Sequence, residues 1–163
     1  MSGEITLRES VRPADREAVR RIVSSSGFFN PEEVEVAVEL VDDRLARGEA
    51  SGYHFIFAER GGETVGYSCF GHIDGTAESH DFYWIAVDGA QQGGGVGGRL
   101  LAATEAAVLR LGGRRLYVET SSRDLYEPTR AFYRKHGYAE ETRLRDFYAP
   151  GDDKLFFVKV LSG

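Results

Sequence analysis

The stretch QQGGGVGG, Gln91 to Gly98, places five glycines in eight residues and runs directly into RLLAATEAAVLRL (99–111), whose pattern is typical of a helix. Each glycine in a regular element costs about 0.5–1 kcal/mol relative to alanine, so a cluster of them indicates that another group must approach the backbone closely. The start of a helix offers free N–H groups and about half a positive charge. The stretch therefore predicts an anion-binding loop at the mouth of a helix.

The whole chain has the size and composition of one globular domain. It contains 163 residues, of which 42% are hydrophobic and 28% are charged, and we expect a single domain over residues 1–163. The net charge is −6 and the basic residues are dispersed, so nucleic acid is not an expected partner. Because no apolar run approaches about 20 residues and MSGEITLRES is no signal peptide, we expect no membrane partner and a cytoplasmic location.

The single cysteine and the four histidines carry no site in this interpretation. Because Cys69 lies in the apolar run GYSCFG, it is expected to be a small buried residue. A single cysteine also excludes an intrachain disulfide. The histidines show no spacing typical of metal ligands. The sequence therefore predicts no metal site.

Hydrophobic periodicity predicts eleven elements in the order β-α-α-β-β-β-α-β-α-β-β. Gly61-Gly62 between two strand-like runs indicates a hairpin, and Asn30-Pro31 indicates the start of a helix. The expected strands cover residues 4–10, 53–60, 63–74, 77–87, 114–120, 139–149 and 152–161, and the expected helices cover 13–26, 30–48, 99–111 and 126–138. This order predicts an α/β domain with some antiparallel pairing.

Other interpretations of the glycine stretch are open at this point. One is a flexible loop without a ligand. Another is the G-x-G-x-x-G of a dinucleotide-binding oxidoreductase, with Glu119 near the distance of the ribose-binding acid. In that fold the glycines follow the strand almost at once, whereas DGAQQ (88–92) intervenes here. A P-loop is excluded because Gly98-Arg99 stands where lysine and serine or threonine are required.

Two motifs together give a more specific interpretation. Gln92 to Gly97 matches the pattern Q/R-x-x-G-x-G/A between a long strand and a helix, and AFYRKHGY (131–138) follows downstream. With these motifs the chain resembles the GNAT superfamily of acetyl-CoA-dependent N-acetyltransferases over nearly its whole length. The resemblance implies a mixed, mostly antiparallel sheet with helices on both faces and a V-shaped split between two central parallel strands.

The same resemblance implies a site for acetyl-CoA as the acyl-donor substrate. Backbone amides would hold the diphosphate, and they belong to Gln92, Gly93, Gly94, Gly95, Val96, Gly97 and Gly98. The pantetheine arm would pair like an added strand with the backbone of Ile85, Ala86 and Val87. Tyr133 occupies the position of the family's tyrosine that protonates the leaving thiolate. Many relatives have an asparagine that contacts CoA at the position of Pro128. Whether this chain makes a contact with CoA there is open.

The base that removes the proton of the amine has several candidates. Glu119 ends the strand RRLYVET and resembles the strand-end glutamate of the ribosomal-protein alanine N-acetyltransferases, and the tail RDFYAPGDDKLFF (145–157) resembles their ending. Glu119 also reads as a solvated strand end or as an ion-pair partner of Arg114 or Arg115. The alternative is that a chain of water molecules carries the proton to a residue of the strand 77–87, namely His80, Asp81 or Tyr83.

The expected function is direct transfer of an acetyl group to a primary amine of a small molecule or peptide. The alternative is a non-catalytic acyl-CoA-binding or sensing module of the same fold. The sequence leaves open which amine is the acceptor, whether a longer acyl-CoA is preferred, and whether the chain forms a homodimer as many relatives do. Aromatic and polar residues expected to border the acceptor are Phe28, Phe29, Asn30, Phe147 and Tyr148.

Overall fold

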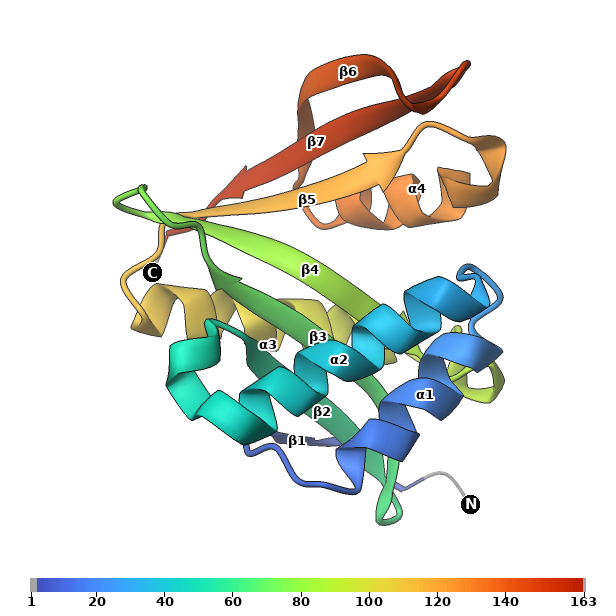
Figure 1. The fold of residues 1–163 in the computed structure, drawn as a ribbon, viewed down its shortest axis with the longest axis vertical. Helices are drawn as coiled ribbons and strands as arrows, with labels where there is room; N and C mark the ends of the chain where they lie inside the picture. The colour runs from blue at the N-terminus through green and yellow to red at the C-terminus, as the bar shows by residue number, and fades with distance from the viewer. Residues whose placement is uncertain (1–2, 163) are drawn as a thin grey trace. The chain divides into compact units, whose positions relative to one another are not determined.

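The computed structural model describes residues 3–162, and it contains the expected strands and helices in the expected order (Figure 1). The strands form a seven-stranded sheet in the order β1-β2-β3-β4-β5-β7-β6. The pairs β1–β2, β2–β3, β5–β7 and β6–β7 are antiparallel, whereas β4 and β5 are parallel. The expected α/β class with a mixed, mostly antiparallel sheet is confirmed.

The element bounds differ from the expected ones by a few residues. The strands are β1 Thr6–Arg8, β2 His54–Arg60, β3 Glu63–His72, β4 Ser79–Val87, β5 Arg115–Ser121, β6 Ala139–Ala149 and β7 Asp152–Val160. The helices are α1 Asp15–Ser25, α2 Pro31–Arg47, α3 Val96–Arg110 and α4 Glu127–Lys135. Three short 3-10 segments, at Gly48–Ser51, Gly89–Gln91 and Asp124–Tyr126, were not expected. Each is a single turn, too short to show a periodicity.

Local chemistry explains the boundaries that agree best. The Asn30 side chain accepts a hydrogen bond from the Glu33 backbone N–H at 2.8 Å, and the Glu33 side chain accepts one from the Asn30 N–H at 3.0 Å. This reciprocal capping box fixes the start of α2. Gly61 and Gly62 have φ of 60° and 81°, the conformation that a tight turn between β2 and β3 requires.

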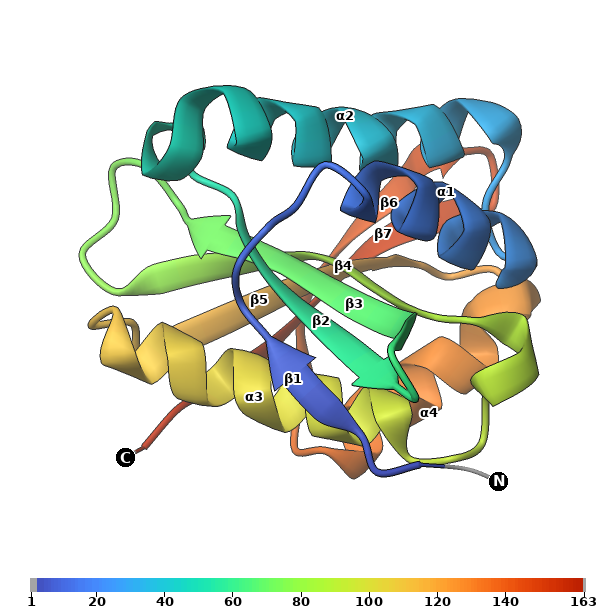
Figure 2. The same cartoon turned by 90° about the horizontal axis from the view of Figure 1, so that it is seen from below.

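The chain divides into two compact units, and the first contains residues up to 71 together with 84–104. In this unit α1 and α2 lie on one face of β1–β3, and the first part of α3 lies on the other (Figure 2). The core between the two helices and the sheet includes Val19, Ile22, Val23, Val38, Val41, Phe55, Phe57 and Tyr67. On the opposite face Gly66 gives α3 room, since a β-carbon there would lie 3.1 Å from Leu100 and 3.2 Å from Val96.

The second unit contains residues 72–83 and 105–163, and its strands are β5, β6, β7 and the first part of β4. α4 runs alongside β5 and β7 (Figure 1). The strand residues on the side of α4 are buried, and they are Leu116, Val118, Leu155 and Phe157. Because strand side chains alternate, Tyr117, Glu119, Lys154 and Phe156 occupy the other face.

The parallel ladder between β4 and β5 is short. It pairs Ser79 with Arg115 and ends at the pair Asp81 and Tyr117. Within the described residues of the second unit, Phe82 and Tyr83 of β4 follow this ladder without a paired residue in β5.

The structure also bears on membrane insertion. Within residues 3–162, none of the helices combines the length and the apolar composition needed to span a bilayer.

Candidate functional site

The glycine loop, residues 92–98, joins the end of β4 to α3. Gly93 and Gly95 have φ of 85° and 83°, a conformation that residues with a β-carbon rarely adopt. α3 begins at Val96, three residues before the expected start at Arg99. Gly97 and Gly98 therefore lie in its first turn. No acidic residue lies in that turn. The positive end of the helix dipole is therefore not offset by a side chain, which suits it to an anion.

The approach to the glycine loop is anchored on α1. The Gly89 N–H donates to Ser25 Oγ at 3.0 Å, and Arg21 forms an ion pair with Asp88 at 2.7 Å. A β-carbon on Gly89 would lie 2.6 Å from the Ser25 carbonyl oxygen, so only glycine fits this approach. These contacts fix the path of the chain immediately before the loop.

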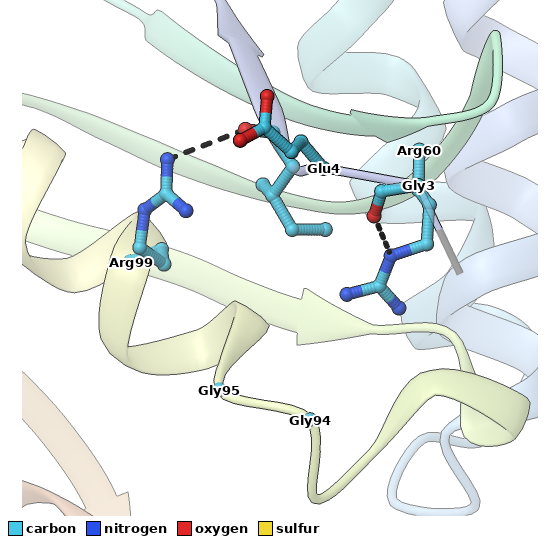
Figure 3. Close-up of a pocket in the computed structure, with 7 residues that line it drawn as sticks. Gly3, Glu4, Arg60, Gly94, Gly95 and Arg99 are labelled. Atoms are coloured by element: carbon cyan, nitrogen blue, oxygen red, sulfur yellow. Dashed lines mark hydrogen bonds between the residues drawn. The ribbon is translucent and has the colours of Figure 1, made fainter.

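A pocket of about 600 Å³ flanks the glycine loop (Figure 3). Its lining residues are Gly3, Glu4, Ile5, Arg60, Gly94, Gly95 and Arg99. Arg60 Nε donates to the Gly3 carbonyl at 3.1 Å, and Arg99 Nη2 donates to the Ile5 carbonyl at 3.3 Å. Two guanidinium groups and one carboxylate give the pocket an excess of positive charge, in keeping with an anion nearby.

The end of β4 is held firmly on the side of β3. The Asp88 N–H donates to the Val65 carbonyl at 2.8 Å. Ala86 is buried, and its carbonyl oxygen would lie 3.1 Å from a β-carbon on Gly66. Ile85 and Val87 are partly exposed. The backbone expected to pair with pantetheine is thus fixed in place by its neighbouring strand.

Tyr133 lies in the second unit, on α4, and only 4% of its surface is exposed. Its ring centroid is 5.7 Å from that of Tyr138 and 6.5 Å from that of Phe157. Burial raises the pKa of the Tyr133 phenol well above its usual range. The phenol therefore holds its proton at neutral pH more tightly than an exposed tyrosine does.

Glu119 lies near the end of β5 and forms an ion pair with Lys154. The alternative interpretation as an ion-pair partner thus applies with Lys154 in place of Arg114 or Arg115. β7 lies beside β5 with Ser121 opposite Lys154, and this register brings the lysine onto the face that carries Glu119. Lys154 was missed by the sequence analysis, because nothing in the sequence shows which strand neighbours β5.

Asp81 is the titratable group at the end of the β4–β5 ladder. Burial and, second to it, the negative charge of Glu119 raise the pKa of Asp81 to about 6, while Lys154 acts in the opposite direction. His80 is buried, and its Nδ1 would lie 2.6 Å from a β-carbon on Gly113. Among the alternatives to Glu119 as the base, Asp81 has a pKa close to neutral pH and is influenced by the carboxylate of Glu119.

Aromatic rings accompany the carboxylates in the second unit. Lys154 Nζ lies 4.4 Å from the ring centroid of Phe147 and 5.1 Å from that of Phe156. Phe147 and Tyr148 are about half exposed, and their rings meet edge to face at 5.1 Å. In the first unit, Phe29 contacts Trp84 with ring centroids 4.8 Å apart.

Cys69 is not a nucleophile in this fold. Its side chain is fully buried in the first unit, and burial raises the pKa of the thiol well above its usual range. The thiolate that nucleophilic chemistry needs is therefore not formed.

Comparison with known proteins places this arrangement in a family. Residues 51–140 match the model of the acetyltransferase (GNAT) domain. A GNAT-family protein from Desulfovibrio desulfuricans has 44% identical residues and a TM-score of 0.96, with 98% of this chain and 100% of that chain covered. A search of the curated protein sequences finds no significant match.

Two further solved structures share the fold at low identity. An aminoglycoside 6′-N-acetyltransferase complexed with coenzyme A has a TM-score of 0.79 at 19% identity, with 97% and 98% of the two chains covered. The ribosomal-protein-S18-alanine N-acetyltransferase from Escherichia coli has a TM-score of 0.75 at 19% identity, with 98% and 97% covered. These likenesses show the fold alone.

Proposed function

The chain belongs to the acetyltransferase (GNAT) domain family, and we propose that it transfers an acetyl group from acetyl-CoA directly to a primary amine. The observation that carries the proposal is the glycine loop, in which two positive-φ glycines lead into a helix start without acidic side chains. We further propose that the two compact units act together as one catalytic domain, located in the cytoplasm.

The residues of the first unit suit acetyl-CoA as the acyl donor. A β-carbon on Gly93 or Gly95 would meet no atom within 4 Å, so the space beside their backbone is open to a ligand. In this proposal the amides of Gln92–Gly98 hold the diphosphate, and the backbone of Ile85–Val87 aligns the pantetheine arm. The coenzyme A bound to the aminoglycoside relative supports a ligand of this class.

The two carboxylates of the second unit suit the proton chemistry of the amine. An acceptor must lose its ammonium proton before its nitrogen can attack the thioester carbonyl. Asp81, with its pKa of about 6, is ionised at neutral pH and is a stronger base than an ordinary carboxylate. We assign the role of proton acceptor to Asp81. The negative charge of Glu119 raises the basicity of Asp81. This assignment replaces the expectation that Glu119 itself accepts the proton.

Departure of the thiolate completes the transfer. As the neutral nitrogen bonds to the acetyl carbon, the carbon–sulfur bond breaks. The nitrogen releases its second proton and the sulfur takes up one, so that the amide and the CoA thiol are both neutral. We assign the donor to Tyr133 because of its place in the motif AFYRKHGY on α4; its phenol carries a proton at neutral pH, as any tyrosine does.

Calorimetric titration with acetyl-CoA tests the proposal. Wild type is compared with the double variant Gly95→Asp, Gly97→Asp and with NAD⁺ and NADP⁺ as alternative ligands. Micromolar binding of acetyl-CoA that the double variant loses is the expected result. Gly75→Asp is the matched control, because Gly75 also has a positive φ of 83° but lies in the turn between β3 and β4. A preference for NAD⁺ or NADP⁺, or no binding of acetyl-CoA, would contradict the proposal.

A further inference from the structure

Lys154 occupies a small site that is built like a receptor for an ammonium group. Its Nζ is paired with the carboxylate of Glu119 and lies over the rings of Phe147 and Phe156. We call Glu119, Phe147 and Phe156 the ammonium cage. A carboxylate and aromatic faces are the groups that bind a cation without removing its charge.

The cage lies on the same face as the carboxylates of the proposed reaction. Glu119 is the cross-strand partner of Phe156, and Ser121 is the partner of Lys154, so their side chains share one face of the sheet. Asp81 is influenced by the charges of both Glu119 and Lys154. An amine held in the cage would therefore lie near the carboxylate that is proposed to take its proton.

The occupant of the cage is unusual for this chain. Only three of its twenty Lys and Arg residues are lysines, at positions 135, 154 and 159. An arginine would present a planar fork, whereas lysine presents a compact ammonium at the end of an unbranched chain. The cage is thus filled by a group with the shape of an alkylamine.

The cage is accessible from solvent on one side. The Lys154 side chain is 17% exposed, that of Glu119 is 40% exposed, and Phe147 is 53% exposed. Lys154 is bonded to no backbone group through its Nζ among the described residues, so its ammonium can leave the cage by side-chain rotation alone.

We propose that the acceptor binds as an alkylammonium in the ammonium cage and displaces Lys154, so that the acceptor carries its primary amine on an unbranched aliphatic chain, as a lysine side chain or a polyamine does. This inference rests on the proposed function and names its substrate class. The lysine of the chain itself then acts as an internal competitor of the acceptor.

The variant Lys154→Met tests this inference, because methionine keeps an unbranched side chain and removes the charge. Acetylation is measured with three acceptors, which are cadaverine, Nα-acetyl-lysine methylamide and alaninamide. We expect the KM of the first two to fall about tenfold in Lys154→Met, since a competing ion pair is removed, with little change for the α-amine of alaninamide. The ratio between cadaverine and the lysine derivative distinguishes a polyamine from a lysine side chain as the natural acceptor.

A probe that cannot be acetylated gives a readout independent of turnover. Butyltrimethylammonium should bind Lys154→Met more tightly than wild type by about tenfold in calorimetry, because quaternary ammonium groups bind well between aromatic rings. Lys159→Met is the matched control: Lys159 lies on the same strand, pairs with Glu105 at 3.0 Å and lies 5.7 Å from the ring centroid of Tyr138. It should change neither measurement.

Two results would overturn the inference. Acetylation of alaninamide in preference to both alkylamines, or unchanged alkylamine KM and probe affinity in Lys154→Met, would show that the cage does not receive the acceptor, while the acetyltransferase function stands. A protein that fails to bind acetyl-CoA in the parallel titration would instead overturn the proposed function, and the inference with it.

Discussion

Asp81 and Glu119 are electrostatically coupled carboxylates in the second unit: burial and then the negative charge of Glu119 raise the pKa of Asp81 to about 6. Glu119 is in turn paired with Lys154. The three groups therefore form one system in which a change in any charge alters the basicity of Asp81. Substitutions at these three residues should therefore change the pH dependence of acetyl transfer in directions set by the charge removed.

The first prediction concerns the pH dependence of acetyl transfer. Asp81 must be ionised to accept a proton, so kcat/KM should be low below pH 6 and should rise as the pH passes through about 6. Glu119→Gln removes a negative charge and should shift this rise to lower pH, whereas Lys154→Met removes a positive charge and should shift it to higher pH. Profiles of kcat/KM for the three proteins check this, and shifts in the same direction would contradict the coupling.

The second prediction concerns stability. The folded pKa of Asp81 lies above its unfolded value of 3.8, so the folded state binds more protons between those two values and loses stability as the pH rises through about 6. Asp81→Asn removes this cost and should stabilise the protein at pH 8 by about 1 kcal/mol, a figure discounted for the partial exposure of the group. Urea denaturation at pH 8 and pH 4 checks it, since the gain should vanish at pH 4. A variant less stable than wild type at pH 8 would show that the Asp81 charge is compensated in the fold.

The third prediction separates the phenol of Tyr133 from its ring. Tyr133→Phe keeps the packing against Phe157 and removes the proton donor, so turnover should fall about 10²-fold while affinity for acetyl-CoA is unchanged. Tyr138→Phe is the control, because it removes the hydrogen bond from Tyr138 Oη to Glu105 at 2.8 Å and should cost about 1 kcal/mol of stability without loss of turnover. Full turnover by Tyr133→Phe would reduce Tyr133 to a packing residue.

The fourth prediction concerns the anchor of the glycine loop. In Gly89→Ala the added β-carbon would lie 2.6 Å from the Ser25 carbonyl oxygen, so the backbone before the loop must move. We expect a loss of about 1–3 kcal/mol of stability and weaker binding of acetyl-CoA. Gly94→Ala, where the nearest atom would be 3.4 Å away, should cost much less stability. Equal denaturation midpoints for the two variants would contradict this anchoring role.

Much of the fold could be predicted because its signals are local. The capping pair Asn30 and Glu33 and the hairpin glycines 61 and 62 act over a few residues, and all of them behave as their chemistry requires. The predicted start of α3 at Arg99 lies three residues too late, because Gly97 and Gly98 favour a loop over a helix in the sequence. In a first turn the N–H groups have no intrahelical partner in any case, so glycine is tolerated there.

The candidate site was harder to predict because its contacts are non-local. Asp81 and Glu119 are 38 residues apart and come together through the β4–β5 ladder, and Glu119 meets Lys154 only because β7 pairs with β5. Neither strand neighbour nor register can be read from the sequence. A bulge in β6 was also missed, where Asp146 has a φ of 54° and accepts a hydrogen bond from the Gly151 N–H.

Acetyl transfer itself is tested by incubating the wild-type protein with acetyl-CoA and cadaverine at pH 8 and quantifying acetylated amine by mass spectrometry together with free CoA thiol. We expect acetyl-cadaverine and CoA in equal amounts over many turnovers, with both products reduced strongly in Asp81→Asn. Binding of acetyl-CoA with neither product formed from any primary amine in a broad panel would contradict this expectation, and would identify the chain as a non-catalytic acyl-CoA-binding module.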